Sequence, residues 1–289
     1  MATRDIITAV PVAFHPDGAL DLDGSRAILR YVAASGNEGA FVMGTTGEFP
    51  ALTFEERGLL ATASVEELAA HMRVIVHVGA PSLREVLALI AQAREAGATE
   101  IAVITPYYLP ATDGALREFF AAVSAASDGL DVYVYVYRKR TGNFVSTELM
   151  AELALLPNIV GAKVSEEPLE QFAAYRSVVP DGFVLYTGAD RDLGKIGDHG
   201  AQGVVSGISS VFPKPFRALA EAAESGDAGR IASAQKAVDD VVDTVAGDIA
   251  RMKAAYALLD VPAGVSRMAL EAPSGEVLTE LGRVAALHG

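Results

Sequence analysis

One lysine stands where a strand pattern ends, and its type and place suit nucleophilic chemistry. Residues 159–163 read Ile-Val-Gly-Ala-Lys, and a period of two puts Ile159, Gly161 and Lys163 on one face. If that face is buried, loss of solvent disfavours the ammonium form and lowers the lysine pKa, as an amine that attacks a ketone requires. A solvated lysine just beyond the strand is the alternative. The remaining lysines fall in expected loops or helices, at Lys139, Lys195, Lys214, Lys236 and Lys253.

A second group is the alternating run at residues 133–137, which reads Tyr-Val-Tyr-Val-Tyr. Tyr133, Tyr135 and Tyr137 share a face, while the valines point the other way. Phenols directed into a barrel indicate a polar upper cavity, where a hydroxyl can carry protons to and from a carbinolamine. Tyrosines packed outward against helices are the alternative.

A third group is the turn Gly44-Thr45-Thr46-Gly47-Glu48, which follows another strand pattern. Glycines permit a tight turn, and successive backbone amides can then converge on a carboxylate. The turn could also be an ordinary surface loop.

The elements that must position these groups recur along the chain. Short apolar, β-branched segments alternate with amphipathic ones such as 53–71 and 82–97, which indicates repeated strand-helix units. A chain of 289 residues with such units suits one (β/α)8 TIM barrel, whose catalytic groups lie at the carboxyl ends of its strands. We expect a barrel domain at residues 1–225 and a C-terminal helical extension at 226–289. The eight expected strands are 5–10, 39–43, 73–78, 100–104, 131–137, 159–163, 182–187 and 202–206.

Composition narrows the classes of function. The formal net charge of −14 disfavours nucleic acid as a partner, and no apolar run is long enough to cross a membrane. With no cysteine and five scattered histidines, we expect neither a protein-bound metal nor another cofactor. We interpret His77 as a packed barrel residue. The N-terminal segment lacks the order of a signal peptide, so we expect a cytoplasmic protein.

Together the motifs resemble one family. Gly44-Thr45-Thr46-Gly47-Glu48, Thr105-Pro106-Tyr107-Tyr108, Tyr135 with Arg140-Thr141-Gly142, and Gly161-Ala162-Lys163 are similar in order and spacing to the dihydrodipicolinate synthase/N-acetylneuraminate lyase family. The resemblance spans the barrel. It implies a lyase that joins pyruvate to an aldehyde, or separates them, through a lysine Schiff base.

The resemblance also implies a role for each residue. Lys163 would form the Schiff base, Tyr135 would be the acid/base phenol beside it, and Thr45 and Thr46 would hold the pyruvoyl carboxylate. Tyr108 would complete a proton relay across a tight dimer interface, so we expect a homo-oligomer, a dimer of dimers. The remaining pocket residues would be Arg140, which meets a carboxylate of the second substrate, and Gly188, Val205 and Ser206.

One segment departs from the family pattern. Between Tyr135 and Arg140 the synthases read Asn-Val-Pro-Ser, whereas this chain has Val-Tyr-Arg-Lys at 136–139. We expect 4-hydroxy-tetrahydrodipicolinate synthase-like activity, with Arg138 and Lys139 adding to the preference of Arg140 for a carboxylated partner. A retro-aldolase or dehydratase of a 2-oxo sugar acid or 4-hydroxy-2-oxoglutarate is the first alternative, and a non-catalytic 2-oxo acid-binding protein is the second.

Overall fold

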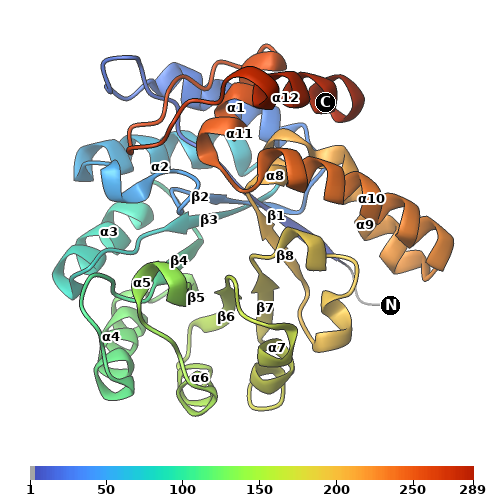
Figure 1. Ribbon diagram of the computed structural model, residues 1–289. Coiled ribbons are helices and arrows are strands. Elements are labelled where there is room, and N and C mark those ends of the chain that lie inside the picture. Colours follow the sequence, from blue (N-terminus) through green and yellow to red (C-terminus); the bar gives the residue numbers. More distant parts are fainter. Residues whose placement is uncertain (1–3) are drawn as a thin grey trace.

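Eight parallel strands close into a barrel in which each strand pairs with its neighbours in chain order and β8 returns to β1 (Figure 1). The computed structural model describes residues 4–289, so the first three residues of the expected barrel domain lie outside it. The expected eight strands and TIM-barrel fold are confirmed. The strands are β1 Asp5–Ala9, β2 Gly39–Val42, β3 Arg73–His77, β4 Glu100–Ile104, β5 Asp131–Val136, β6 Ile159–Val164, β7 Val184–Thr187 and β8 Gly203–Ser206.

Helices surround the barrel, and several begin at side chains that cap free backbone amides. Thr53 and Glu56 form a reciprocal capping box at the start of α2, and Ser82 caps α3. The barrel helices are α1 Leu22–Ala33, α2 Phe54–Leu68, α3 Leu83–Glu95, α4 Asp113–Ala126, α5 Arg138–Thr141, α6 Thr147–Leu153, α7 Leu169–Arg176, α8 Ile208–Val211 and α9 Pro213–Ser225, with 3-10 turns at Phe49–Ala51, Asp190–Asp192 and Ile196–His199.

The expected C-terminal extension is helical, with a break in its first part. The helical stretch 227–259 is two helices, because Ala246 and Gly247 adopt positive φ angles of 53° and 65° and end the first. The helices are α10 Ala228–Val245, α11 Ile249–Leu258 and α12 Gly275–His288 (Figure 1). α12 packs against α10 and α11, and Tyr256 of α11 meets Tyr31 of α1 edge to face. No helix within residues 4–289 is both long and apolar enough to span a bilayer.

The alternation of β5 and β6 divides the core in two. Tyr133, Tyr135 and Tyr137 belong to the cluster inside the barrel, whereas Val132 and Val134 pack in the layer between strands and helices. The prediction that the three tyrosines face inward is therefore confirmed. Tyr135 pairs in register with Lys163, which sets the phenol and the amine side by side at the carboxyl ends of their strands.

Candidate active site

Lys163 points into the barrel and is only 6% exposed. Its Nζ lies 4.1 Å from the ring centroid of Tyr135 and 4.5 Å from that of Phe41. Burial lowers its pKa to about 7, an effect that the nearby Asp190 carboxylate partly opposes. At neutral pH a large share of this lysine is therefore the free amine.

Gly161, two residues before Lys163 on the same face of β6, leaves room for a neighbouring ring. A Cβ at Gly161 would lie 2.8 Å from Cε1 of Tyr133 and 2.6 Å from the carbonyl oxygen of Val184. Glycine at 161 thus admits the Tyr133 ring, which forms the floor under the lysine.

Tyr135 and Thr45 form a hydroxyl pair beside the amine. The Tyr135 OH lies 3.1 Å from Thr45 Oγ1, and Ser165 also hydrogen-bonds to the phenol. Burial raises the pKa of Tyr135 to about 12, so the phenol is protonated at neutral pH and can act as an acid.

The turn that carries Thr45 leaves amides available at the cavity. The amides of Gly47, Glu48 and Phe49 bond to carbonyls within the turn. Those of Thr45 and Thr46 have no acceptor among residues 4–289. Both threonines line the cavity, so the turn can receive an anionic group there.

The C-terminal extension fixes that turn through a buried ion pair. Lys253 Nζ lies 2.7 Å from Glu48 Oε1, and the Met268 amide donates to Glu48 Oε2 over 2.7 Å. Both charged side chains are almost fully buried, and Glu48 has a left-handed backbone with φ 53°. Sequence reasoning placed Lys253 on a helix without a role, because the two partners are 205 residues apart.

A cavity of about 250 Å³ opens over these groups. Gly188 and Val205 line it, as predicted, but Ser206 does not. Ser206 instead hydrogen-bonds to Asp190. The break between α10 and α11 supplies further lining, through Ala246, Gly247, Ile249 and Met252.

Asp190 is the main cavity residue that sequence reasoning missed. Its Oδ1 is buried with no hydrogen-bond partner among residues 4–289, and burial raises the pKa of its carboxyl to about 6. The available signal was its position shortly after β7, where barrel enzymes place reactive side chains.

Arg140 lines the cavity, but its two basic neighbours do not. The Arg138 guanidinium lies over the Phe144 ring, and Lys139 pairs with Glu166. The short helix α5 turns Arg138 and Lys139 away from the cavity, so neither can contact a ligand there directly, and their effect on the preference for a carboxylated partner stays a prediction. Glu166, also missed from the sequence, lines the cavity at its rim.

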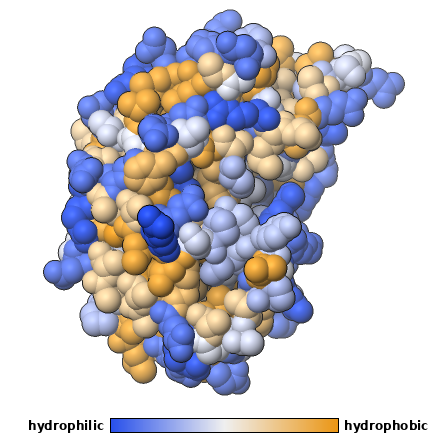
Figure 2. All heavy atoms as spheres, turned by 90° about the vertical axis from the view of Figure 1, so that its left-hand side faces the viewer, coloured by the Kyte–Doolittle hydropathy of each residue, from blue (hydrophilic) through white to orange (hydrophobic). Residues whose placement is uncertain are grey.

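Tyr108 does not reach the cavity of its own chain. Its ring is 91% exposed on a left-handed backbone with φ 79°, next to the exposed Leu109. The side of the molecule that carries α2, α3 and α4 shows hydrophobic patches among polar residues (Figure 2). A role for Tyr108 in a second copy of the chain stays a prediction.

His77 is packed inside the barrel and does not line the cavity. His77 is fully buried, its Nδ1 lies 2.9 Å from the Met43 carbonyl oxygen, and burial holds its pKa well below the usual range. Within residues 4–289, no three His, Asp or Glu side chains gather as a metal site would require. The geometry offers a free amine, a protonated phenol and an anion-binding turn around one cavity.

Known proteins with the same sequence pattern agree on the family. The model of the dihydrodipicolinate synthetase family matches residues 2–285. A Halobacterium salinarum protein named an uncharacterized DapA-like lyase is 35% identical over 93% of this chain and 89% of its own length. The 4-hydroxy-tetrahydrodipicolinate synthase 1 of Streptomyces coelicolor is 33% identical over 98% and 94% of the two chains.

The fold agrees as well. The crystal structure of dihydrodipicolinate synthase from Aquifex aeolicus matches with a TM-score of 0.90 and 27% identity, over 99% of this chain and 97% of that one. A family match over nearly the whole chain, with relatives named as lyases and synthases, leads to one conclusion: this chain belongs to the dihydrodipicolinate synthetase family.

Proposed function

We propose that this protein is a class I lyase that forms an imine between Lys163 and pyruvate, or a closely related 2-oxo acid. The observation that carries the proposal is the buried lysine, whose pKa falls to about 7 beside a protonated phenol and an anion-binding turn. Thr45 and Thr46 would hold the carboxylate of the 2-oxo acid. Its ketone carbon would then face the lysine amine.

The chain's own groups account for the covalent steps. The Lys163 amine adds to C2 of pyruvate, and the Tyr135 phenol protonates the departing hydroxyl, so that water leaves and an iminium forms. Loss of a C3 proton gives an enamine, whose C3 attacks the aldehyde carbon while the aldehyde oxygen takes a proton. Water then hydrolyses the carbon-nitrogen bond and restores the amine. Cleavage is the reverse sequence.

The partner substrate has two candidate classes. The Streptomyces coelicolor relative's name favours a 4-hydroxy-tetrahydrodipicolinate synthase-like condensation. In that reaction Arg140 would meet a carboxylate on the aldehyde. The altered segment 136–139 favours the other class, cleavage or dehydration of a 2-oxo sugar acid or 4-hydroxy-2-oxoglutarate.

The assembly and domain division also belong to the proposal. We propose a catalytic barrel at residues 1–225 and a helical extension at 226–289 that fixes the carboxylate turn through Lys253. A homo-oligomer would let Tyr108 of one chain extend the proton relay of another. A non-catalytic binding protein fits less well, because binding alone has no use for an amine with a lowered pKa.

Borohydride trapping tests the imine. Wild-type protein treated with pyruvate and sodium borohydride should gain the mass of a reduced pyruvyl group on the peptide that contains Lys163. Lys163→Met should gain none, while Lys214→Met, which changes a lysine on α9 far from the cavity lining, should be labelled like the wild type. Unchanged wild-type mass, or a label on another lysine, would contradict the proposal.

A further inference from the structure

The loop after β6 holds a carboxylate at the rim of the cavity by two separate contacts. The Tyr137 OH donates to Glu166 Oε1, and Lys139 Nζ lies 2.6 Å from Glu166 Oε2. Glu166 also has a left-handed backbone with φ 58°, a conformation that non-glycine residues adopt at a cost. Two of the residues in the altered segment 136–139 therefore act together to place this side chain.

Glu166 carries a fixed negative charge between two cationic side chains before any substrate enters. The Lys139 ammonium, and then the Tyr137 phenol, hold the pKa of Glu166 below its usual range, so the carboxylate is ionised at neutral pH. Arg140 lies over the Tyr137 ring, with 5.8 Å from its Cζ to the ring centroid, and its charge interacts with that of Glu166. Lys139 stays mostly exposed on the outer side and does not line the cavity.

The closeness of Arg140 and Glu166 determines which groups of a substrate this side of the cavity can bind. A second carboxylate approaching Arg140 would also approach the fixed Glu166 carboxylate, and like charges repel. Hydroxyl groups meet no such conflict, because one hydroxyl can donate to Glu166 while its neighbour accepts from Arg140.

We propose that Glu166 is a specificity-determining residue that fits the partner side of the cavity to hydroxyl groups. The aldehyde partner is then an uncharged, polyhydroxylated compound, and the joined substrate is a 2-oxo acid of the sugar-acid class. This inference rests on the imine chemistry proposed for Lys163. Through Glu166, it favours a hydroxylated aldehyde over a carboxylated one as the partner of pyruvate.

A merely structural latch is the competing explanation for the Glu166 contacts. An exposed ion pair such as Lys139–Glu166 contributes little to stability, so a latch would leave the choice of aldehyde unchanged when it is removed. The measurement that separates the two explanations is a ratio of kcat/KM values among aldehydes.

The experiment compares three aldehydes with pyruvate as the common donor. Glyceraldehyde carries hydroxyls, succinic semialdehyde carries a carboxylate, and propanal carries neither. Wild type should use glyceraldehyde best. Glu166→Gln should lower kcat/KM for glyceraldehyde by about 10- to 100-fold, the usual range for a lost hydrogen bond to a charged group, leave propanal unchanged and not impair succinic semialdehyde.

Two controls make the result decisive. Glu170→Gln changes an exposed glutamate in the first turn of α7 that does not line the cavity, and it should leave all three kcat/KM values unchanged. Borohydride trapping with pyruvate should be normal in both variants. Equal loss across all three aldehydes in Glu166→Gln, or wild-type preference for succinic semialdehyde, would overturn the inference while leaving the imine intact. Absence of trapping in wild type would instead overturn the proposed function, and the inference with it.

Discussion

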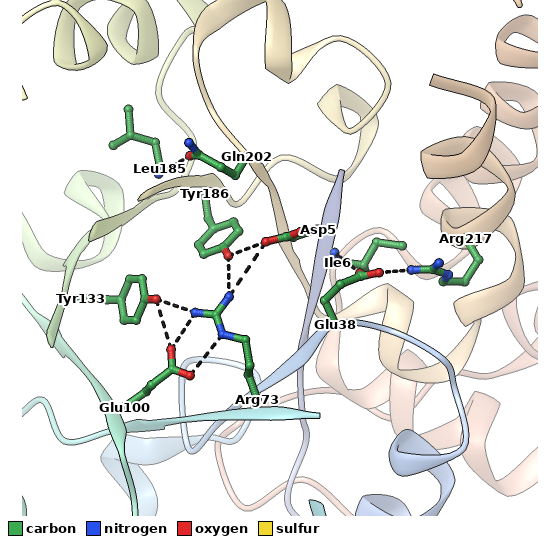
Figure 3. Close-up of polar contacts among 10 residues, drawn as sticks. All are labelled: Asp5, Ile6, Glu38, Arg73, Glu100, Tyr133, Leu185, Tyr186, Gln202 and Arg217. Atoms are coloured by element: carbon green, nitrogen blue, oxygen red, sulfur yellow. Dashed lines mark hydrogen bonds and ion pairs between the residues drawn. The ribbon is translucent and has the colours of Figure 1, made fainter. Parts of the chain in front are cut away.

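The amino end of the barrel carries a polar network in which each charge has a partner (Figure 3). Arg73 donates from Nε to Glu100 over 3.1 Å, from Nη2 to the same carboxylate over 2.6 Å, and from Nη1 to Tyr186 over 3.0 Å. Tyr186 donates to Asp5, and Tyr133 to Glu100. Hydrogen bonds to Glu100 raise the pKa of Arg73, and burial raises those of both tyrosines, so these groups keep their protons across the physiological range.

The carboxyl end carries similar side-chain types in a different state. Lys163 has aromatic rings as neighbours, and Asp190 has a buried oxygen with no partner among residues 4–289. Their pKa values move towards neutrality, to about 7 and about 6. Burial acts at both ends of the barrel, but the ion-paired Arg73 keeps its proton, whereas Lys163 and Asp190, which form no ion pair among residues 4–289, become ready to exchange protons.

Removing the phenol from the reactive end should have the largest effect on turnover. Tyr135→Phe keeps the ring against Lys163 but loses the proton donor, so we expect kcat to fall by roughly 10²–10⁴-fold. Pyruvate should still bind. Steady-state kinetics measures the fall in kcat, and titration of the variant with pyruvate measures binding. A kcat near that of wild type would mean that Tyr135 is structural and that the carboxyl end does not exchange protons through it.

Breaking the polar network at the amino end of the barrel should instead reduce the stability of the fold. Arg73→Met leaves the mostly buried Glu100 carboxylate without its cation, and we expect the free energy of unfolding to fall by about 2–4 kcal/mol. Urea unfolding measures this change, with Arg117→Met, which removes an exposed surface pair with Glu152, as the control that should leave the free energy of unfolding nearly unchanged. The kcat of folded Arg73→Met should stay within about threefold of wild type, since no proton moves through this network. A large fall in kcat without loss of stability would refute the division between the ends.

The pH dependence of imine formation should distinguish a buried lysine from a solvated one without any substitution. Because burial lowers the pKa of Lys163 to about 7, the neutral amine is lost as pH falls below that value. The rate should drop by about tenfold for each pH unit well below 7 and level off above it. Rapid-quench trapping between pH 5 and 9 measures the profile. A rate that continues to rise towards pH 10 would indicate an ordinary, solvated lysine.

Local patterns predicted the fold and part of the site. The period of two along β5 and β6 placed Tyr135 and Lys163 inside the barrel, because strand geometry fixes which side chains share a face. Asp190 and Glu166 could not be found in this way, since they lie in loops whose path depends on packing. The Glu48–Lys253 pair was missed for a related reason: nothing near either residue in the sequence indicates the other.

The buried Glu48–Lys253 pair has a consequence for the order in which parts of the fold can form. Glu48 leaves the ribosome long before Lys253 and Met268, which supply its cation and its amide donor. Until they arrive, closing the barrel would bury a carboxylate alone, which costs several kcal/mol. The turn at residues 44–48 can therefore take its final shape only after Lys253 and Met268 are available to it.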